Sequence, residues 1–275
     1  MSAPELPVLT RRDRVVLVAL GVVAGLASAL FGIGGGLVVV PVLVALVRFP
    51  IKVAVGTSLL AIGAVALVGV ATEALVAPEN IRVTVALALV AGSLLGARLG
   101  AAWARALPDA LLRYGLVAFI VVSALRLFGW ISFGGGSGPL DEGLFSLEAD
   151  PVPALALEAV VGFAAGVAAS LFGIGGGIIV VPATTFLLAD VPFHAARATS
   201  LLMILPTALV GSRQHARYGH VHAAAAATLA PAGALGAVAG VFLANRIEAP
   251  LLRTLFGTFL LLVAFRLVFV RKKSG

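Results

Sequence analysis

The feature that most constrains the fold is a series of long apolar runs with almost no charged residue. These runs cover residues 15–47, 53–72, 83–97, 159–189, 198–212, 223–245 and 254–265. A transmembrane helix needs about 20 mostly apolar residues, and flanking positions can extend the shorter runs. The apolar residues are continuous rather than alternating, which excludes an outer-membrane barrel. The sequence therefore predicts an all-α polytopic membrane protein.

Composition agrees with this fold class and excludes several others. Hydrophobic residues make up 61% of the chain and charged residues 11%, less than half the share of about 25% that is usual in soluble domains. The net charge of +7 does not indicate nucleic-acid binding, because the basic residues lie at the ends of apolar runs and form no patch. The absence of cysteine excludes disulfides, thiolate metal sites and thiol catalysis. Arg11, Arg12 and Arg14 lead into a run without a clear cleavage site, which predicts a retained anchor rather than a signal peptide.

A glycine-rich motif interrupts the apolar runs twice, at matched places. Phe31–Gly36 is followed by apolar residues up to Pro41, and Phe172–Gly177 is followed by apolar residues up to Pro182. Glycine adopts backbone angles that other residues avoid, and it lets another group approach the main chain. Further matches follow each copy, for example Gly69 with Gly211. The duplication predicts two halves with the same fold.

Each predicted half contains five apolar segments, and the first two meet at the glycine break. We expect about ten helices in all. The predicted division is a first transmembrane repeat over 1–128, a linker over 129–153 and a second repeat over 154–275. Five crossings are odd, and so are the three that remain if the first two segments form a re-entrant hairpin. Either way the second half inserts the other way up, as an inverted-topology repeat.

The charges predict the orientation of this repeat. The linker is glycine-rich and acidic, without Lys or Arg, and we expect it to be flexible and extracytoplasmic. By the positive-inside rule both termini are expected in the cytoplasm. The basic residues expected on that side are Arg11, Arg12, Arg14, Arg48, Lys52, Arg105, Arg113, Arg213, Arg217 and the tail 271–273. Those expected outside are Arg82, Arg197, Arg246 and Arg253.

The glycine breaks are the predicted substrate-binding site. If they lead into helices, free N–H groups and the positive ends of two helix dipoles would attract an anion. The candidate residues are Gly32, Gly34, Gly35, Gly36, Gly173, Gly175, Gly176 and Gly177. Alternatively, the glycines only allow tight packing or a sharp turn. Their duplication at symmetric positions is typical of transporters with broken helices near the bilayer midplane, so we expect the breaks to meet there.

Four hydroxyls and one arginine are further candidates. Thr57, Ser58, Thr199 and Ser200 fall near the starts of matched helices. Their hydroxyls either face the breaks or bond helix backbone. Arg197 matches Val55 in the first half and has two interpretations. It adds charge to the anion pocket, or it extends to the outer interface, which is the favoured alternative.

The histidines close to the end of the second-half helix form a basic group. His215, His220 and His222 are expected to be interfacial anchors, or one of them titrates near neutral pH and couples transport to protons. Glu73 matches His215 and is expected to face water at a helix end. No carboxylate stands at metal-ligand spacing, and we expect neither a metal site, a cofactor nor catalytic residues. Coupling to protons or to sodium stays open.

Two glycine stripes have a structural explanation. Gly92, Gly96 and Gly100 are spaced by four residues, as are Gly236 and Gly240. Small residues at this spacing allow helices in a membrane to pack closely. We expect helix contacts along both stripes.

With these motifs the chain resembles the sulfite exporter TauE/SafE family of membrane permeases. The resemblance rests on Gly-x-Gly-Gly-Gly followed by an apolar run to Pro, at 32–41 and 173–182. It also rests on the Gly/Ala-Thr-Ser-Leu steps at 56–59 and 198–201, and it covers both halves. It implies a multi-pass permease of a bacterial or archaeal plasma membrane that exports sulfite, sulfoacetate or a similar small sulfur anion.

Together these features predict a secondary transporter that works by alternating access, with a small anion and the lipid bilayer as partners. No Walker motif indicates direct use of ATP. An anion channel with the same pore and a permease for another small organic anion are the alternatives. A membrane scaffold or an intramembrane enzyme is a third class. It lacks support, because no carboxylate pair, Ser/His pair or metal cluster falls within the predicted spans.

Overall fold

The computed structural model of the chain describes the backbone of residues 8–103, 109–130 and 145–269. Within these ranges it contains ten α-helices, one short 3-10 helix and no strand. The helices are α1 (Arg11–Phe31), α2 (Gly36–Ala45), α3 (Ile51–Val76), η1 (Pro78–Asn80), α4 (Val83–Trp103), α5 (Asp109–Leu127), α6 (Pro151–Phe172), α7 (Gly177–Leu187), α8 (Phe193–Arg217), α9 (Ala223–Ala244) and α10 (Ala249–Phe269). The predicted all-α fold class is confirmed.

Six of the helices are long and apolar enough to cross a membrane, namely α1, α3, α4, α6, α8 and α9. Large apolar side chains also cover the outside of the molecule. Leu67, Leu87, Leu235 and Leu262 are each more than half exposed. Soluble proteins rarely expose such a surface, whereas lipid tails solvate it without cost. The prediction of a polytopic membrane protein is confirmed.

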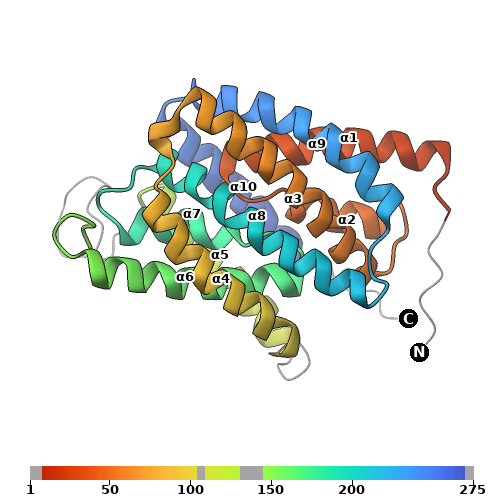
Figure 1. Cartoon of the computed structure of the whole chain (residues 1–275), viewed down its shortest axis with the longest axis horizontal. Coiled ribbons are helices and arrows are strands. Elements are labelled where there is room, and N and C mark those ends of the chain that lie inside the picture. The colour runs from red at the N-terminus through yellow and green to blue at the C-terminus, as the bar shows by residue number, and fades with distance from the viewer. Residues whose placement is uncertain (1–7, 104–108, 131–144, 270–275) are drawn as a thin grey trace.

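The two broken segments are hairpins. Leu17 and Leu20 on α1 belong to one buried cluster with Leu43 on α2 and with Val47, so the second arm returns toward the start of the first. The α6–α7 pair turns back in the same way, with Glu158 on α6 bonded to Thr184 on α7. Figure 1 shows the two hairpins entering from opposite ends of the long axis, with their turns near the middle. The two segments of each pair therefore fold back on each other, and whether a pair re-enters the membrane on one side stays a prediction.

Each hairpin packs on a helix of the other half. The long arm α1 lies along α9, and α6 lies along α4. Glycines permit both contacts, because a Cβ added to Gly25 would lie 1.9 Å from the carbonyl oxygen of Gly233. Likewise, a Cβ on Gly96 would lie 2.1 Å from the carbonyl oxygen of Phe163. The predicted packing role of the glycine stripes is confirmed, and the two halves interlock.

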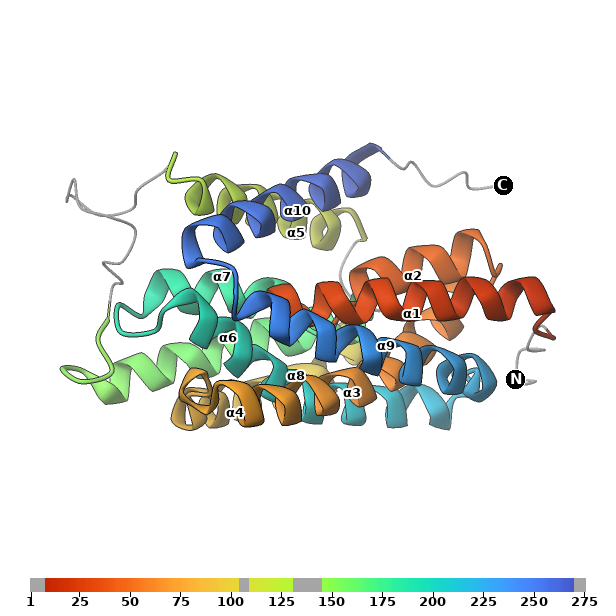
Figure 2. The same cartoon turned by 90° about the horizontal axis from the view of Figure 1, so that it is seen from above.

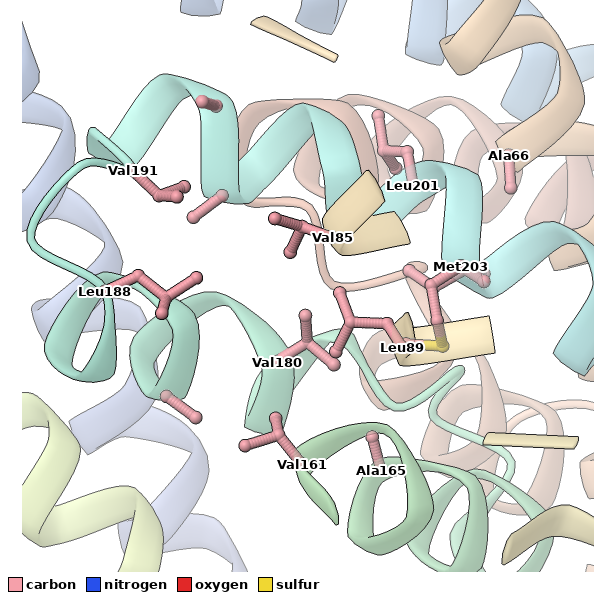
Figure 3. Packing of buried hydrophobic residues seen from close by; sticks show 14 of the residues in the cluster. Ala66, Val85, Leu89, Val161, Ala165, Val180, Leu188, Val191, Leu201 and Met203 are labelled. Carbon is pink, nitrogen blue, oxygen red and sulfur yellow. The ribbon is translucent and has the colours of Figure 1, made fainter. Parts of the chain in front are cut away.

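The remaining helices complete the bundle. Between the hairpins α3 packs against α8, and α5 pairs with α10 in a separate layer (Figure 2). A large apolar cluster joins α6 and α7 to α4 and α8, and we call it the α6–α7 cluster. Figure 3 shows its side chains, among them Val85, Val161, Val180, Leu188 and Val191. The equivalent α1–α2 cluster contains Leu17, Leu43, Phe49 and Val53.

Polar residues gather at the two ends of the molecule. One end, here the basic end, comprises the start of α1, the loop 46–50 with the start of α3, and the loop 218–222. Phe49 stacks on His222 there, with ring centroids 5.0 Å apart. The other end, here the linker end, comprises η1, residues 145–150, and the loops that precede α8 and α10. The amide of Phe145 bonds the carbonyl oxygen of Leu187, which ties the end of the linker to α7.

Candidate functional site

The glycine breaks have the same backbone conformation in both halves. The φ angles of Gly32, Gly34 and Gly35 are 69°, 79° and 69°. Their counterparts Gly173, Gly175 and Gly176 have φ angles of 68°, 78° and 83°. These angles lie in the left-handed region, which a residue with a Cβ enters only at an energetic cost. The repeated motif therefore encodes a specific turn.

The two turns meet each other. A Cβ on Gly36 would lie 2.0 Å from the carbonyl oxygen of Gly173, and a Cβ on Gly177 would lie 2.0 Å from that of Gly32. A Cβ on Gly175 would lie 3.5 Å from the Cα of Gly34. At Gly36 and Gly177 no larger residue fits without a shift of the backbone. The predicted meeting of the two breaks is confirmed, and α2 and α7 begin at this junction.

The junction presents unpaired backbone donors. The N–H groups of residues 33–37 and 174–178 have no hydrogen-bond acceptor in the part of the chain that the structure describes. Neither α2 nor α7 has a side-chain cap at its first turn. Unpaired N–H groups at a helix start carry partial positive charge, and successive N–H groups in such turns form anion-binding nests. The junction thus has the donors that an oxyanion requires.

Two of the predicted hydroxyls reach the breaks. Ser58 on α3 donates to the carbonyl oxygen of Gly173 at 3.4 Å. Ser200 on α8 donates to the carbonyl oxygen of Gly32. Both serines are fully buried, and each bonds the break of the opposite half. The serine side chains therefore join the two turns to α3 and α8.

The adjacent threonines bond other groups. Thr57 accepts a hydrogen bond from the amide of His222 at 2.9 Å. Thr199 accepts one from the amide of Arg82 at 3.1 Å. These amides precede α9 and α4, at equivalent places in the two halves. Both hydroxyls therefore position the loops before the helices that support the hairpins. Neither bonds a glycine break among the described residues, and their role there stays a prediction.

Arg197 is buried inside the bundle. Its Nη2 donates to Oε1 of Glu73 at 2.7 Å, and its Nη1 donates to the carbonyl oxygen of Ala29 at 2.9 Å. Both side chains of this ion pair are 0% exposed. The favoured interfacial position of Arg197 is therefore wrong, and so is the water-facing position of Glu73. The reason is that each charge has the other as its partner, which the sequence separation of the two residues conceals.

Two asparagines complete the network around Glu73. The amide nitrogen of Asn80 donates to Oε1 of Glu73 at 2.9 Å, and that of Asn245 donates to the same oxygen at 3.2 Å. Asn80 also donates to the side-chain oxygen of Asn245 at 2.9 Å. The network joins α3, η1, α8 and α9, and thus both halves. Removing one partner of such a buried pair is strongly destabilising, because the other charge is left unpaired.

The positions at the basic end that match this network in the repeat carry different residues. Val55 stands in place of Arg197, His215 in place of Glu73, and His220 in place of Asn80. His215 packs against α3, since a Cβ on Gly56 would lie 2.7 Å from the Cβ of His215. Burial and the nearby Lys52 hold the pKa of His220 below its ordinary value. The two ends of this symmetric fold therefore differ in charge.

A small pocket lies beside the first break. Its lining includes Gly34 and Gly35 of the break, Val65 of α3 and Gly233 of α9. At the matched place of the second half stand Thr207 and Ser93, whose hydroxyls lie 2.7 Å apart. The sequence interpretation overlooked this pair. Polar residues inside apolar helices are the signal that would have identified it.

The described residues include no cluster of His, Asp and Glu that could hold a metal ion. The groups that converge at the junction are backbone amides, serine hydroxyls and, one helical turn away, the paired arginine.

Comparison with known proteins identifies the family of this chain. The model of the family described as sulfite exporter TauE/SafE matches residues 2–127 and 158–275. The chain belongs to the TauE/SafE family. The matched residues include both glycine breaks, so the family pattern covers the two turns that meet.

Relatives of this TauE/SafE protein carry transporter names. It is 28% identical over 272 residues to the "probable membrane transporter protein YunE" of Bacillus subtilis (strain 168), a match that covers 93% of this chain and 97% of the relative. It is 31% identical over 110 residues to a "probable membrane transporter protein" of Xylella fastidiosa (strain Temecula1 / ATCC 700964), which covers 40% of this chain and 41% of that one. No solved structure matches. This TauE/SafE protein is a multi-pass membrane transporter.

Proposed function

We propose that this transporter exports a small sulfur-containing oxyanion, such as sulfite or sulfoacetate, and binds it where the two glycine breaks meet. The observation that supports the proposal most is the pair of N–H rows at residues 33–37 and 174–178, which lack an acceptor in the described part of the chain. Buried donors without a partner are costly, so a ligand that accepts their hydrogen bonds would be held firmly. The family description supports a sulfur oxyanion as the ligand.

The hairpins suggest how access would alternate. Each turn is held mainly by backbone contacts with the other turn and by one serine, Ser58 or Ser200. A movement of one hairpin and its supporting helix would open the junction toward one end while the other hairpin keeps it closed. Transporters built from repeats work in this way, with rigid units that rock about a fixed central site.

The charges support an orientation with the basic end in the cytoplasm. That end carries Arg11, Arg12, Arg14, Arg48, Lys52, Arg213 and Arg217 among its described residues. The acids Glu79, Glu148, Asp150, Asp190 and Glu248 lie at the linker end. The predicted cytoplasmic residues Arg105 and 271–273 lie outside the described residues, as does the side chain of Arg113. We place both termini in the cytoplasm and the linker outside, in a prokaryotic plasma membrane.

Flux into liposomes tests the proposal. The purified protein is reconstituted, and the movement of sulfite, sulfoacetate, sulfate and thiosulfate is measured separately. We expect saturable flux of at least one sulfur oxyanion, and we expect Gly35→Leu and Gly176→Leu each to abolish it. If no anion of this set moves, or if both variants transport normally, the proposal fails.

Two controls make the result specific. Gly63→Ala alters a buried helical glycine whose added Cβ would make ordinary contacts only, with Ala208 at 3.6 Å and Leu209 at 3.9 Å, so we expect it to transport like the wild type. Electrical recording distinguishes a channel from a carrier. A large current that does not saturate would favour the channel, whereas saturable exchange without such a current supports alternating access.

A further inference from the structure

A second polar site lies outside the junction, inside the α6–α7 hairpin. Glu158 is the eighth residue of α6, about two turns from the start of the helix, and its side chain is 0% exposed. Ala154 and Val161, about one turn before and after it, both belong to the α6–α7 cluster. The carboxyl group therefore lies within an apolar core of a membrane protein.

Only one of the two carboxyl oxygens has a partner. Oε2 accepts a hydrogen bond from the hydroxyl of Thr184 at 2.8 Å. Oε1 is inaccessible and has no partner among the described residues. Thr184 follows Val180 by four residues and precedes Leu188 by four, and both of these neighbours belong to the α6–α7 cluster that Figure 3 shows. The carboxyl and hydroxyl form an isolated polar pair.

Among the described residues no cation forms an ion pair with this carboxyl group. Arg126 of α5, a helix that contacts α7, lies over the ring of Phe186, 4.5 Å from its centroid. The helices packed against α6 are α4, α7 and α8. Helix α7 has no titratable residue, and Arg98 of α4 is exposed. On α8, Arg197 is paired with Glu73, His194 is half-buried, and Arg213, His215 and Arg217 lie at the basic end.

The nearby loops do not supply a partner cation among the described residues either, since Arg82, which precedes α4, is exposed. Asp190 is bonded to Ser146, and Glu148 and Asp150 are exposed. An ionised carboxylate with one donor and no cation is costly in an apolar core. The conformation described here therefore suits the neutral acid, with the proton on Glu158.

The first half shows that the hairpin does not need this pair. The residues that match Glu158 and Thr184 are Leu17 and Leu43, both 0% exposed in the α1–α2 cluster. The same hairpin closes there with two leucines. A buried acid in a membrane helix is expensive, and it is retained where it serves a function such as proton transfer.

We propose that Glu158, with Thr184, is a proton-binding site through which anion transport is coupled to protons. This inference rests on the proposed function. While the hairpin is closed, Glu158 carries the proton. When the hairpin moves and water reaches the carboxyl, the proton leaves and the carboxylate remains. Since this site belongs to the second hairpin alone, that hairpin is the one whose movement depends on protonation.

Proteoliposomes with an imposed pH gradient test the coupling. In the wild type the gradient should drive anion accumulation, and in Glu158→Gln this accumulation should fall about tenfold, within the usual range of coupling between two sites. Anion exchange without a gradient should persist in the variant. Glu148→Gln is the matched control, because Glu148 is exposed at the same end, and it should behave like the wild type.

Several outcomes would overturn the proposal. They are gradient-driven accumulation in Glu158→Gln that equals the wild type, and accumulation that a sodium gradient drives in a Glu158-dependent manner. If Glu158→Gln does not fold, the double variant Glu158→Leu with Thr184→Leu replaces it, because the first hairpin packs with those residues. It should fold and lose the coupling, and retained coupling would refute the proposal.

An infrared measurement separates this inference from the transport proposal. A protonated carboxyl has a C=O stretching band that a carboxylate lacks. We expect such a band in the wild type at neutral pH and its loss in Glu158→Gln, whether or not any tested anion moves. If the wild type and the variant have the same spectrum in this region, Glu158 does not hold a proton.

Discussion

The linker end and the basic end of this transporter share one backbone plan but differ in their buried side chains. At the linker end, Arg197 and Glu73 form an ion pair that is fully buried and joined by two asparagines. At the basic end, the matched residues are Val55 and His215. The glycine turns between the two ends agree closely in their φ angles.

The residues that the two halves share and the residues in which they differ therefore have different roles. The duplicated glycines build the junction, which is symmetric because both turns must fit each other. The charged residues are not duplicated, so they make the two ends of the transporter chemically different.

The largest expected effect comes from breaking the ion pair. Glu73→Gln leaves the charge of Arg197 unpaired in the core, and we expect a loss of about 3–5 kcal/mol in the free energy of unfolding. Denaturant unfolding in detergent measures it. The double variant Arg197→Val with Glu73→His copies the basic end and should lose less than the single variant. An unchanged stability of Glu73→Gln would contradict the role of the pair.

The equivalence of the two glycine turns is tested by Gly35→Ala and Gly176→Ala. Alanine in the left-handed region costs about 1–2 kcal/mol. The added Cβ atoms would also lie 2.7 Å and 2.8 Å from the carbonyl oxygens of Ala24 and Ala165. We expect each variant to lose at least this much stability, and to lose similar amounts. Gly63→Ala should stay close to the wild type in the same unfolding assay. A large difference between the two break variants would mean that the turns are not equivalent.

The serines should give smaller effects. Ser58→Ala and Ser200→Ala each remove one hydrogen bond to a break, worth about 0.5–1.5 kcal/mol. We expect Ser200→Ala to cost more, because the bond of Ser58 to Gly173 is long at 3.4 Å. Thermal unfolding and anion flux are measured on the same samples. If Ser58→Ala is the more damaging variant in both measurements, the ranking from geometry is wrong.

The smallest effect concerns His220 at the basic end. Its lowered pKa means that the folded protein binds this proton less readily than the unfolded chain does. The stability that neutral His220 contributes is present above the ordinary pKa of histidine and is lost as the pH falls below it. His220→Asn copies Asn80, so its unfolding midpoint should decline slightly less on acidification than that of the wild type. A steeper decline in the variant would reverse the sign of this effect.

The fold could largely be predicted from the sequence. The apolar runs, the duplicated glycines and the small-residue stripes are local patterns, and each matches a helix, a turn or a helix contact in the structure. The choice between spanning segments and hairpins could not be made, because an odd number of crossings results either way. The hairpin depends on residues far apart in sequence, such as Leu17 and Leu43, sharing one buried cluster, which no local pattern specifies.

The site was predictable in part. The breaks were located because glycine at a left-handed turn has few substitutes. Arg197 was misplaced because its partner Glu73 belongs to the other half, so neither charge indicates the other in sequence. Glu158 was overlooked because it falls at the edge of a long apolar run, although a lone acid there signals a functional site.

The most direct test of the anion site is a structure with selenite, a close analogue of sulfite whose selenium gives an anomalous signal. We expect one anomalous peak between residues 32–36 and residues 173–177, within hydrogen-bond distance of backbone N–H groups. Gly35→Leu and Gly176→Leu should lack it. A selenite peak elsewhere in the bundle, in a protein that transports sulfite, would contradict the account.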